Sequence, residues 1–227
     1  MSDIYRIYRT NQLYYNLFNN CISYWDLRGD ASDIMGINHG TVSGATLVTD
    51  HLGNLNSAYH FDGSNDIITV SDNSSLDLTN EISIEAMIRP TGFNANSTIC
   101  TKNVSYYFQV HSDGKLACYT YHPGGSSSYS YSNTVLSLDT DYHVVFTEKN
   151  GERKLYIDKV LDNTISMESG IDPSADPLTI GAQDGSRYFD GIIYFVRLWD
   201  AEILQDKINL LADLSNKMYI YPLKRGY

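Results

Sequence analysis

Short runs that alternate between apolar and polar residues recur along most of this chain of 227 residues, separated by Gly, Asn, Asp and Pro. The clearest run is 81–89, in which four apolar residues share one side before Pro90 ends the pattern. A period of two places successive side chains on opposite faces of a β-strand. We expect further strands at 106–111, 115–122, 142–147, 154–157, 178–180 and 192–198.

The turns between these runs indicate antiparallel pairing. Asp113-Gly114 and Asn150-Gly151 each lie between two expected strands, and these residue pairs tolerate the positive φ of tight hairpins. No helices alternate with the strands, so we expect no parallel sheet. The sequence therefore predicts an all-β fold, a two-sheet antiparallel β-sandwich.

Helical periodicity is found only near the C-terminal end. Apolar residues at 203, 204, 208, 211 and 214 form one stripe, which predicts one short helix that starts at Ala201 with Asp200 as its N-cap. We expect this helix to pack on the sandwich; binding to a partner is the alternative. The expected organisation is a Tyr- and Asn-rich N-terminal arm at 1–20, one domain at 21–216 and a C-terminal tail at 217–227.

Charge and hydropathy exclude several classes of function. There are 16 Lys and Arg against 27 Asp and Glu, a formal net charge of −11, which predicts no nucleic-acid binding. No apolar run approaches the ~20 residues of a membrane span, and the first residues lack the pattern of a signal peptide. We expect a soluble protein with no membrane insertion. Free buried thiols are expected for Cys21, Cys100 and Cys118, with a Cys100–Cys118 bridge between neighbouring strands as the alternative.

Six segments, in order along the chain, resemble one family. They are 39–45 (HGTVSGA), 59–66 (YHFDGSND), 75–78 (SLDL), 82–86 (ISIEA), 142–147 (YHVVFT) and 189–200 (FDGIIYFVRLWD). Together they resemble the concanavalin A-like, laminin G-type jelly-roll domains, and the last is also similar to the end of pentraxins. The resemblance implies a jelly roll with one curved sheet.

Two positions depart from the family pattern and bear on calcium. Asp141 stands where family members usually have Trp, and Tyr194 stands where they tend to have an acidic residue. Calcium requires several converging oxygen ligands. Asp33, Asp62 and Asp190 are the candidate ligands, with capping of turns as the alternative.

The resemblance also raises the question of glycan hydrolysis, which needs two acidic residues about 5–10 Å apart. The E-x-D-x-x-E strand of the hydrolases with this fold is missing. Glu81 and Glu85 are the nearest pair, and we expect both to be solvated. His143 matches a family histidine and is expected to pack structurally. The sequence therefore predicts a protein that is not an enzyme.

Tyrosine is unusually frequent, with 19 copies against 7 Phe and 2 Trp. Six of these tyrosines lie at 106, 107, 119, 121, 129 and 131, on either side of a polar loop. Aromatic side chains on an exposed strand face can stack on sugar rings, and their hydroxyls can form hydrogen bonds. The predicted ligand-binding residues are Tyr106, Tyr119, Tyr121, His122, Tyr129 and Tyr131. The alternative is that tyrosine only covers a sheet face.

Two hypotheses on function follow. The first is a lectin-like recognition module that binds surface carbohydrate, as an adhesion component of a virion or phage particle. The second is a structural decoration of a larger viral assembly, without glycan binding. In both, the N-terminal arm is expected to contact virion proteins or further copies of the chain.

Overall fold

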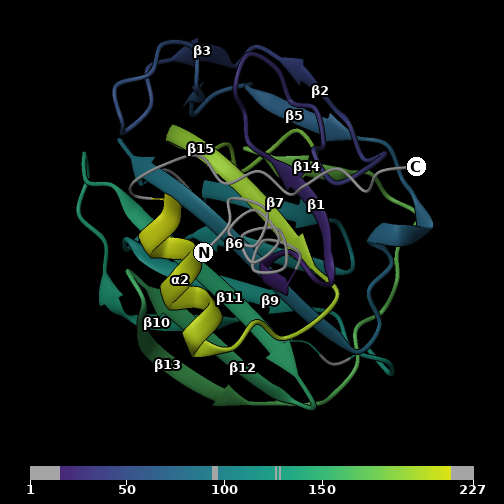
Figure 1. Ribbon diagram of the computed structural model, residues 1–227. Helices are drawn as coiled ribbons and strands as arrows, with labels where there is room; N and C mark the ends of the chain where they lie inside the picture. Colours follow the sequence, from purple (N-terminus) through teal and green to yellow (C-terminus); the bar gives the residue numbers. More distant parts are fainter. Residues whose placement is uncertain (1–15, 94–96, 126, 128, 216–227) are drawn as a thin grey trace, which may run out of the picture.

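The computed structural model describes residues 16–93, 97–125, 127 and 129–215, which form two antiparallel sheets packed face to face (Figure 1). Sheet A has the strand order β13-β12-β11-β6-β15-β4-β3, and β1 also pairs with β15. Its strands are β1 (Cys21–Trp25), β3 (Thr46–Val48), β4 (Ala58–Asp62), β6 (Glu81–Pro90), β11 (Tyr142–Lys149), β12 (Glu152–Ile157), β13 (Val160–Ser166) and β15 (Asp190–Trp199).

Sheet B has the order β10-β9-β8-β7-β14-β5-β2. Its strands are β2 (Gly40–Ser43), β5 (Ile67–Val70), β7 (Ser97–Lys102), β8 (Tyr106–Val110), β9 (Lys115–Thr120), β10 (Ser130–Val135) and β14 (Leu178–Ile180). A short 3-10 helix, η1 (Ser74–Leu76), follows β5. The predicted all-β sandwich is confirmed, and all seven predicted strands are present as β6, β8, β9, β11, β12, β14 and β15.

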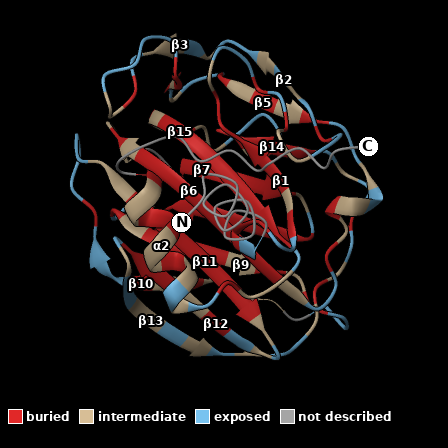
Figure 2. Cartoon of the chain, in the orientation of Figure 1, coloured by how far each residue is buried: buried red, intermediate tan, exposed pale blue. Residues whose placement is uncertain are grey.

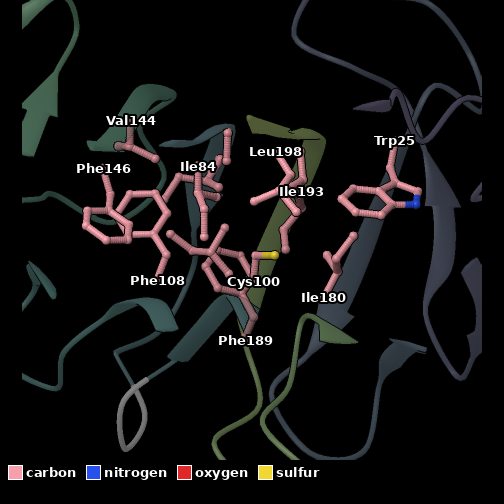
Figure 3. Packing of buried hydrophobic residues seen from close by; sticks show 14 of the residues in the cluster. Trp25, Ile84, Cys100, Phe108, Val144, Phe146, Ile180, Phe189, Ile193 and Leu198 are labelled. Atoms are coloured by element: carbon pink, nitrogen blue, oxygen red, sulfur yellow. The ribbon is translucent and has the colours of Figure 1, made fainter. Parts of the chain in front are cut away.

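The core fills the space between the two sheets. Side chains of sheet A, among them Ile84, Phe146 and Leu198, meet those of sheet B, among them Cys100 and Phe108 (Figure 3). Most of these side chains have no accessible surface, and Figure 2 shows the central strands of both sheets as buried. Burial of this apolar surface supplies the main driving force for the fold.

The predicted helix is present, but it begins later than expected. The helix α2 spans Gln205–Ser215, and residues 201–204 before it are not helical. The hydroxyl of Ser83 donates to the carbonyl of Ala201 at 2.7 Å and accepts from the amide of Ile203 at 3.0 Å. These two bonds hold the connection along β6, so Asp200 is not the N-cap.

A second apolar cluster covers the outer face of sheet A. The helix α2 lies across β11 and β6 (yellow in Figure 1) and packs through Ile208 and Leu211 on Val145 and its neighbours. Leu17 and Phe18 join the same cluster, with 4% and 5% of their surface exposed. The packed domain therefore starts before residue 21, and the predicted arm boundary is too late. Residues 1–15 and 216–227 lie outside the described residues.

An ion pair is buried beneath this cover. The carboxylate of Glu85 lies 2.8 Å from Arg197 Nη1 and 2.7 Å from His143 Nε2, and all three side chains are buried. Burial raises the pKa of Glu85, but the charge of Arg197 and the hydrogen bond from His143 outweigh it and lower the pKa below the usual range. The prediction of a solvated Glu85 is wrong because α2 and Phe18 cover this face.

All three cysteines are free and buried. Cys100 and Cys118 both pair with Phe108, from opposite sides of β8, so they are not on neighbouring strands. In the part of the chain that the structure describes, no helix is long and apolar enough to cross a bilayer.

Candidate binding site: a tyrosine cluster on sheet B

Strand β8 divides its side chains between the core and the outer face of sheet B. Tyr106, Phe108 and Val110 point into the core. Tyr107 and Gln109 alternate with them and therefore lie on the opposite face of the strand, where both are buried. Tyr107 pairs in register with Tyr119 of β9, which brings tyrosines of two strands together on the outer face.

Five tyrosines form a continuous set of ring contacts, which we call the tyrosine cluster: Tyr107, Tyr119, Tyr121, Tyr129 and Tyr131. The ring of Tyr119 is central, with centroid distances of 5.5 Å to Tyr107, 5.0 Å to Tyr121 and 4.8 Å to Tyr129. Tyr129 stacks on Tyr131 at 5.9 Å. All but Tyr107 keep part of their surface exposed. The cluster is thus an aromatic surface open to solvent.

Hydrogen bonds hold the hydroxyl groups of Tyr107 and Tyr119, and the pKa of Tyr107 and of Tyr121 is raised. The hydroxyl of Tyr107 donates to Asn103 Oδ1 at 2.5 Å and accepts from the amide of Val104, and that of Tyr119 donates to Ser127. Burial raises the pKa of Tyr107 to about 12. The hydrogen bond with Tyr119 raises the pKa of Tyr121. Neutral phenols can both donate and accept hydrogen bonds toward a ligand.

The same face continues as a polar row. In register with Tyr119 and Tyr107 lie four threonines on successive strands of sheet B: Thr101, Thr179, Thr69 and Thr41. Each alternates with core residues of its strand and so faces outward. Thr41 and Thr69 keep part of their surface exposed, whereas Thr101 and Thr179 are buried and donate to backbone carbonyls.

One cation reaches the cluster from the loop after β14. Arg187 Nη1 donates to the hydroxyl of Tyr129 at 3.1 Å and to Gln183 Oε1 at 2.8 Å. The backbone carbonyl of Arg187 accepts from the amide of Thr98 in β7. The side chain therefore extends from the edge of β7 toward the tyrosines. No local sequence pattern around Arg187 marked it as part of a site.

Four of the six predicted ligand-binding residues lie in the cluster, namely Tyr119, Tyr121, Tyr129 and Tyr131. The other two point the opposite way and cannot contact a ligand on this face. Tyr106 has no exposed surface, and its hydroxyl donates to the carbonyl of Leu76 at 3.1 Å inside the core. His122 is 2% exposed, and its Nδ1 donates to the carbonyl of Gly170 at 2.6 Å. Strand alternation directs both inward, and it makes Tyr107 the member that the prediction missed.

A buried ion pair of sheet A supports the strands of the cluster from beneath. Arg153 and Glu148 of sheet A point into the sandwich, with Arg153 Nε 2.9 Å from Glu148 Oε2. The guanidinium also donates to Thr120 Oγ1 at 2.5 Å and to Ser130 Oγ at 2.9 Å, which belong to β9 and β10. These bonds fix the two strands that carry Tyr119 and Tyr131.

The three candidate calcium ligands do not converge. Asp33 accepts from the amides of Tyr24, Met35 and Asn38, so its oxygens cap a turn. Asp33 forms an isolated bridge with Trp25, and Trp25 pairs with Val196 of β15. Val196 lies six residues from Asp190 along this strand, so Asp33 does not converge with Asp190.

Asp62 and Asp190 do face each other in register, but Asp62 caps the amides of Ser64 and Asn65. Within the described ranges, no group of three or more His, Cys, Asp or Glu could hold a metal. These residues do not fit a shared calcium site, and calcium binding stays a prediction.

The two departures from the family pattern contact each other. The hydroxyl of Tyr194 donates to Asp141 Oδ1 at 2.6 Å, and Arg89 donates to both oxygens of the same carboxylate. The hydrogen bonds from Arg89 and Tyr194 outweigh the effect of burial and lower the pKa of Asp141. The two unusual residues thus form one polar contact on sheet A.

Glu81 and Glu85 do not form a hydrolytic pair. Glu81 lies 2.9 Å from Lys149 Nζ and accepts from the amide of Glu202. Glu85 is buried with Arg197. Glu85 has no accessible surface beneath α2.

The fold and its sequence define the family. The model of the concanavalin A-like lectin/glucanases superfamily, Laminin_G_3, matches residues 62–209, which is more than half of the chain. The chain therefore belongs to this superfamily, as the six segments predicted. No curated protein matches the chain at a significant level.

Solved structures share the fold at low sequence identity. Domain 4 of AbnA, an extracellular arabinanase from Geobacillus stearothermophilus, in complex with arabinotriose, aligns with a TM-score of 0.69 and 17% identity, over 85% of this chain and 98% of that chain. The binding domain of Paraclostridial Mosquitocidal Protein 1 aligns with a TM-score of 0.67 and 16% identity, over 86% of this chain and 52% of that chain. A structure of botulinum neurotoxin type C, which interacts with two ganglioside molecules, aligns with a TM-score of 0.66 and 18% identity, over 87% of this chain and 52% of that chain. This chain thus spans about half the length of the toxin chains.

Proposed function

We propose that this chain is a lectin-like module that binds carbohydrate through the tyrosine cluster and carries out no chemistry of its own. The observation that carries the proposal is the cluster itself, with five contacting rings that carry phenol hydroxyls, on the outer face of sheet B. Apolar rings with fixed polar groups are the typical lining of a small-molecule site.

The chemistry of a sugar suits this surface. Its C–H face can stack on an aromatic ring, while its hydroxyls exchange hydrogen bonds with phenols. The arabinanase domain with bound arabinotriose has the same fold, which supports a carbohydrate-binding module in this chain. The buried position of Glu85 supports a role without catalysis.

The setting of the module stays a prediction from the sequence alone. A virion or phage adhesion component, or a structural decoration without glycan binding, would make its contacts through the N-terminal arm. Most of that arm lies outside the described residues. A negative glycan screen on folded protein favours the structural role.

A glycan-array screen with three variants tests the proposal. Tyr119→Ala removes the central ring and is expected to weaken the best hit by about tenfold or more, as a central aromatic contact does. Tyr119→Phe keeps the ring and is expected to retain most binding. Tyr142→Ala, at a half-buried tyrosine of sheet A, is the matched control and leaves binding unchanged. Equal binding by Tyr119→Ala and the unaltered chain contradicts the proposal, provided that thermal melting shows both to be folded.

A further inference from the structure

Arg187 stands apart from the other arginines that the structure describes. Arg28, Arg89, Arg153 and Arg197 each lie within 4.0 Å of an Asp or Glu carboxylate. Arg187 forms no such pair among the described residues, and its two hydrogen bonds go to neutral oxygens. The chain has a net charge of −11, yet no described carboxylate pairs with this cation, so its charge is available to an anionic ligand.

The position of Arg187 directs that charge toward the tyrosine cluster. Its backbone lies beside Thr98 of β7, and its guanidinium reaches the hydroxyl of Tyr129, whose ring contacts Tyr119 of β9. The side chain thus extends along the outer face of sheet B. Its backbone φ of 52° lies in a region that residues other than glycine rarely adopt.

Unpaired polar groups lie in the strands beneath this path. Gln109 and Thr98 pair in register on β8 and β7, and both side chains are fully buried. The amide nitrogen and oxygen of Gln109 and the hydroxyl of Thr98 have no hydrogen-bond partner among the described residues. An unpaired buried polar group is costly and therefore rare, and a binding site is one place where it is retained.

From these observations we infer that the tyrosine cluster binds a saccharide that carries a carboxylate, and that Arg187 binds this carboxylate. A guanidinium forms charge-assisted, bidentate hydrogen bonds with a carboxylate, and a neutral sugar has no equivalent group. Gln109 and Thr98 supply further polar groups when Arg187 turns from Tyr129 to the ligand. The inference rests on the proposed function and adds the class of sugar.

The test compares one acidic glycan with its own methyl ester, which has the same rings without the charge. The probes are 3′-sialyllactose and an oligogalacturonate, each as the acid and as the methyl ester, titrated by calorimetry at fixed salt. The unaltered chain is expected to bind one of the acids about tenfold more tightly than its ester. A hydrogen bond to a charged group contributes more to the binding free energy than one between neutral groups, and the difference corresponds to about this factor in Kd.

Arg187→Gln is expected to remove this preference, so that the variant binds the acid and the ester with equal affinity. Arg28→Gln is the matched control, because it changes the net charge equally in a loop next to sheet A and away from the cluster. Thermal melting establishes that both variants are folded.

The outcomes separate the inference from the proposed function. Loss of the acid preference in Arg187→Gln alone supports both. Equal binding of acid and ester, unaltered by Arg187→Gln, overturns the inference and leaves the proposed function standing. A blank array and no binding of either form by the unaltered chain overturn both.

Discussion

Removal of the carboxylate at Glu148 is expected to destabilise the domain strongly. The side chains of Glu148 and Arg153 are 2% and 0% exposed, and their ion pair joins sheet A to Thr120 and Ser130 of sheet B. Glu148→Leu leaves the guanidinium buried without its counter-charge, which costs about 3–5 kcal/mol. For a chain of this size, 1 kcal/mol corresponds to about 2–4 °C in Tm, so Tm should fall by about 6–20 °C.

A double-mutant cycle measured by urea unfolding distinguishes the ion pair from simple loss of packing. Arg153→Met alone is expected to cost as much as Glu148→Leu, whereas the double variant should cost much less than the sum, because no unpaired charge is left. Lys159→Met breaks the exposed pair with Asp213 and is expected to change stability by less than about 1 kcal/mol. A loss below about 1 kcal/mol in Glu148→Leu, or additive losses in the cycle, would refute this reasoning.

Three further predictions concern single side chains. Gln109→Met removes two unpaired buried polar atoms, so Tm should stay or rise; a fall of more than about 5 °C contradicts the assignment of those atoms as unpaired. Asp33→Ala deprives three amides of their acceptor and should cost at least about 2 kcal/mol, equally with calcium and with chelator; a loss that depends on calcium would instead show a metal at Asp33. The pKa of Tyr107 rises from 10.0 to about 12 in the folded chain, so its stabilisation is complete below pH 10 and lost as the pH rises toward 12. Urea unfolding between pH 9 and 12 should show a shallower decline in Tyr107→Phe than in the unaltered chain, and identical declines contradict the shift.

Strand alternation predicted most of the fold and part of the site. Runs such as 81–89 specified strands because one face of each packs on the core. The same rule could have separated the adjacent tyrosines, since Tyr106 shares its parity with Phe108 and Val110, whereas Tyr107 shares its parity with polar Gln109. It would also have directed His122 inward, together with Thr120.

Long-range contacts were not predictable from local patterns. Glu85 alternates as an outward residue, and only the packing of α2 and Phe18 over sheet A buries it. Arg187 lies in an irregular loop, and the hydrogen bond from the amide of Thr98 in β7 to its carbonyl holds it near the cluster. The role that we propose for Arg187 therefore depends on contacts between residues that are far apart in the sequence.

The most direct test of the central claim is to locate the ligand on the chain by NMR. Amide chemical shifts of isotope-labelled protein are followed while the best glycan of the array is titrated. The largest changes are expected on the outer face of sheet B, at Tyr107, Tyr119 and Tyr131 and in the loop with Arg187. Changes that concentrate on sheet A, or none in β8, β9 and β10 at saturating glycan, would contradict the assignment of the tyrosine cluster as the binding site.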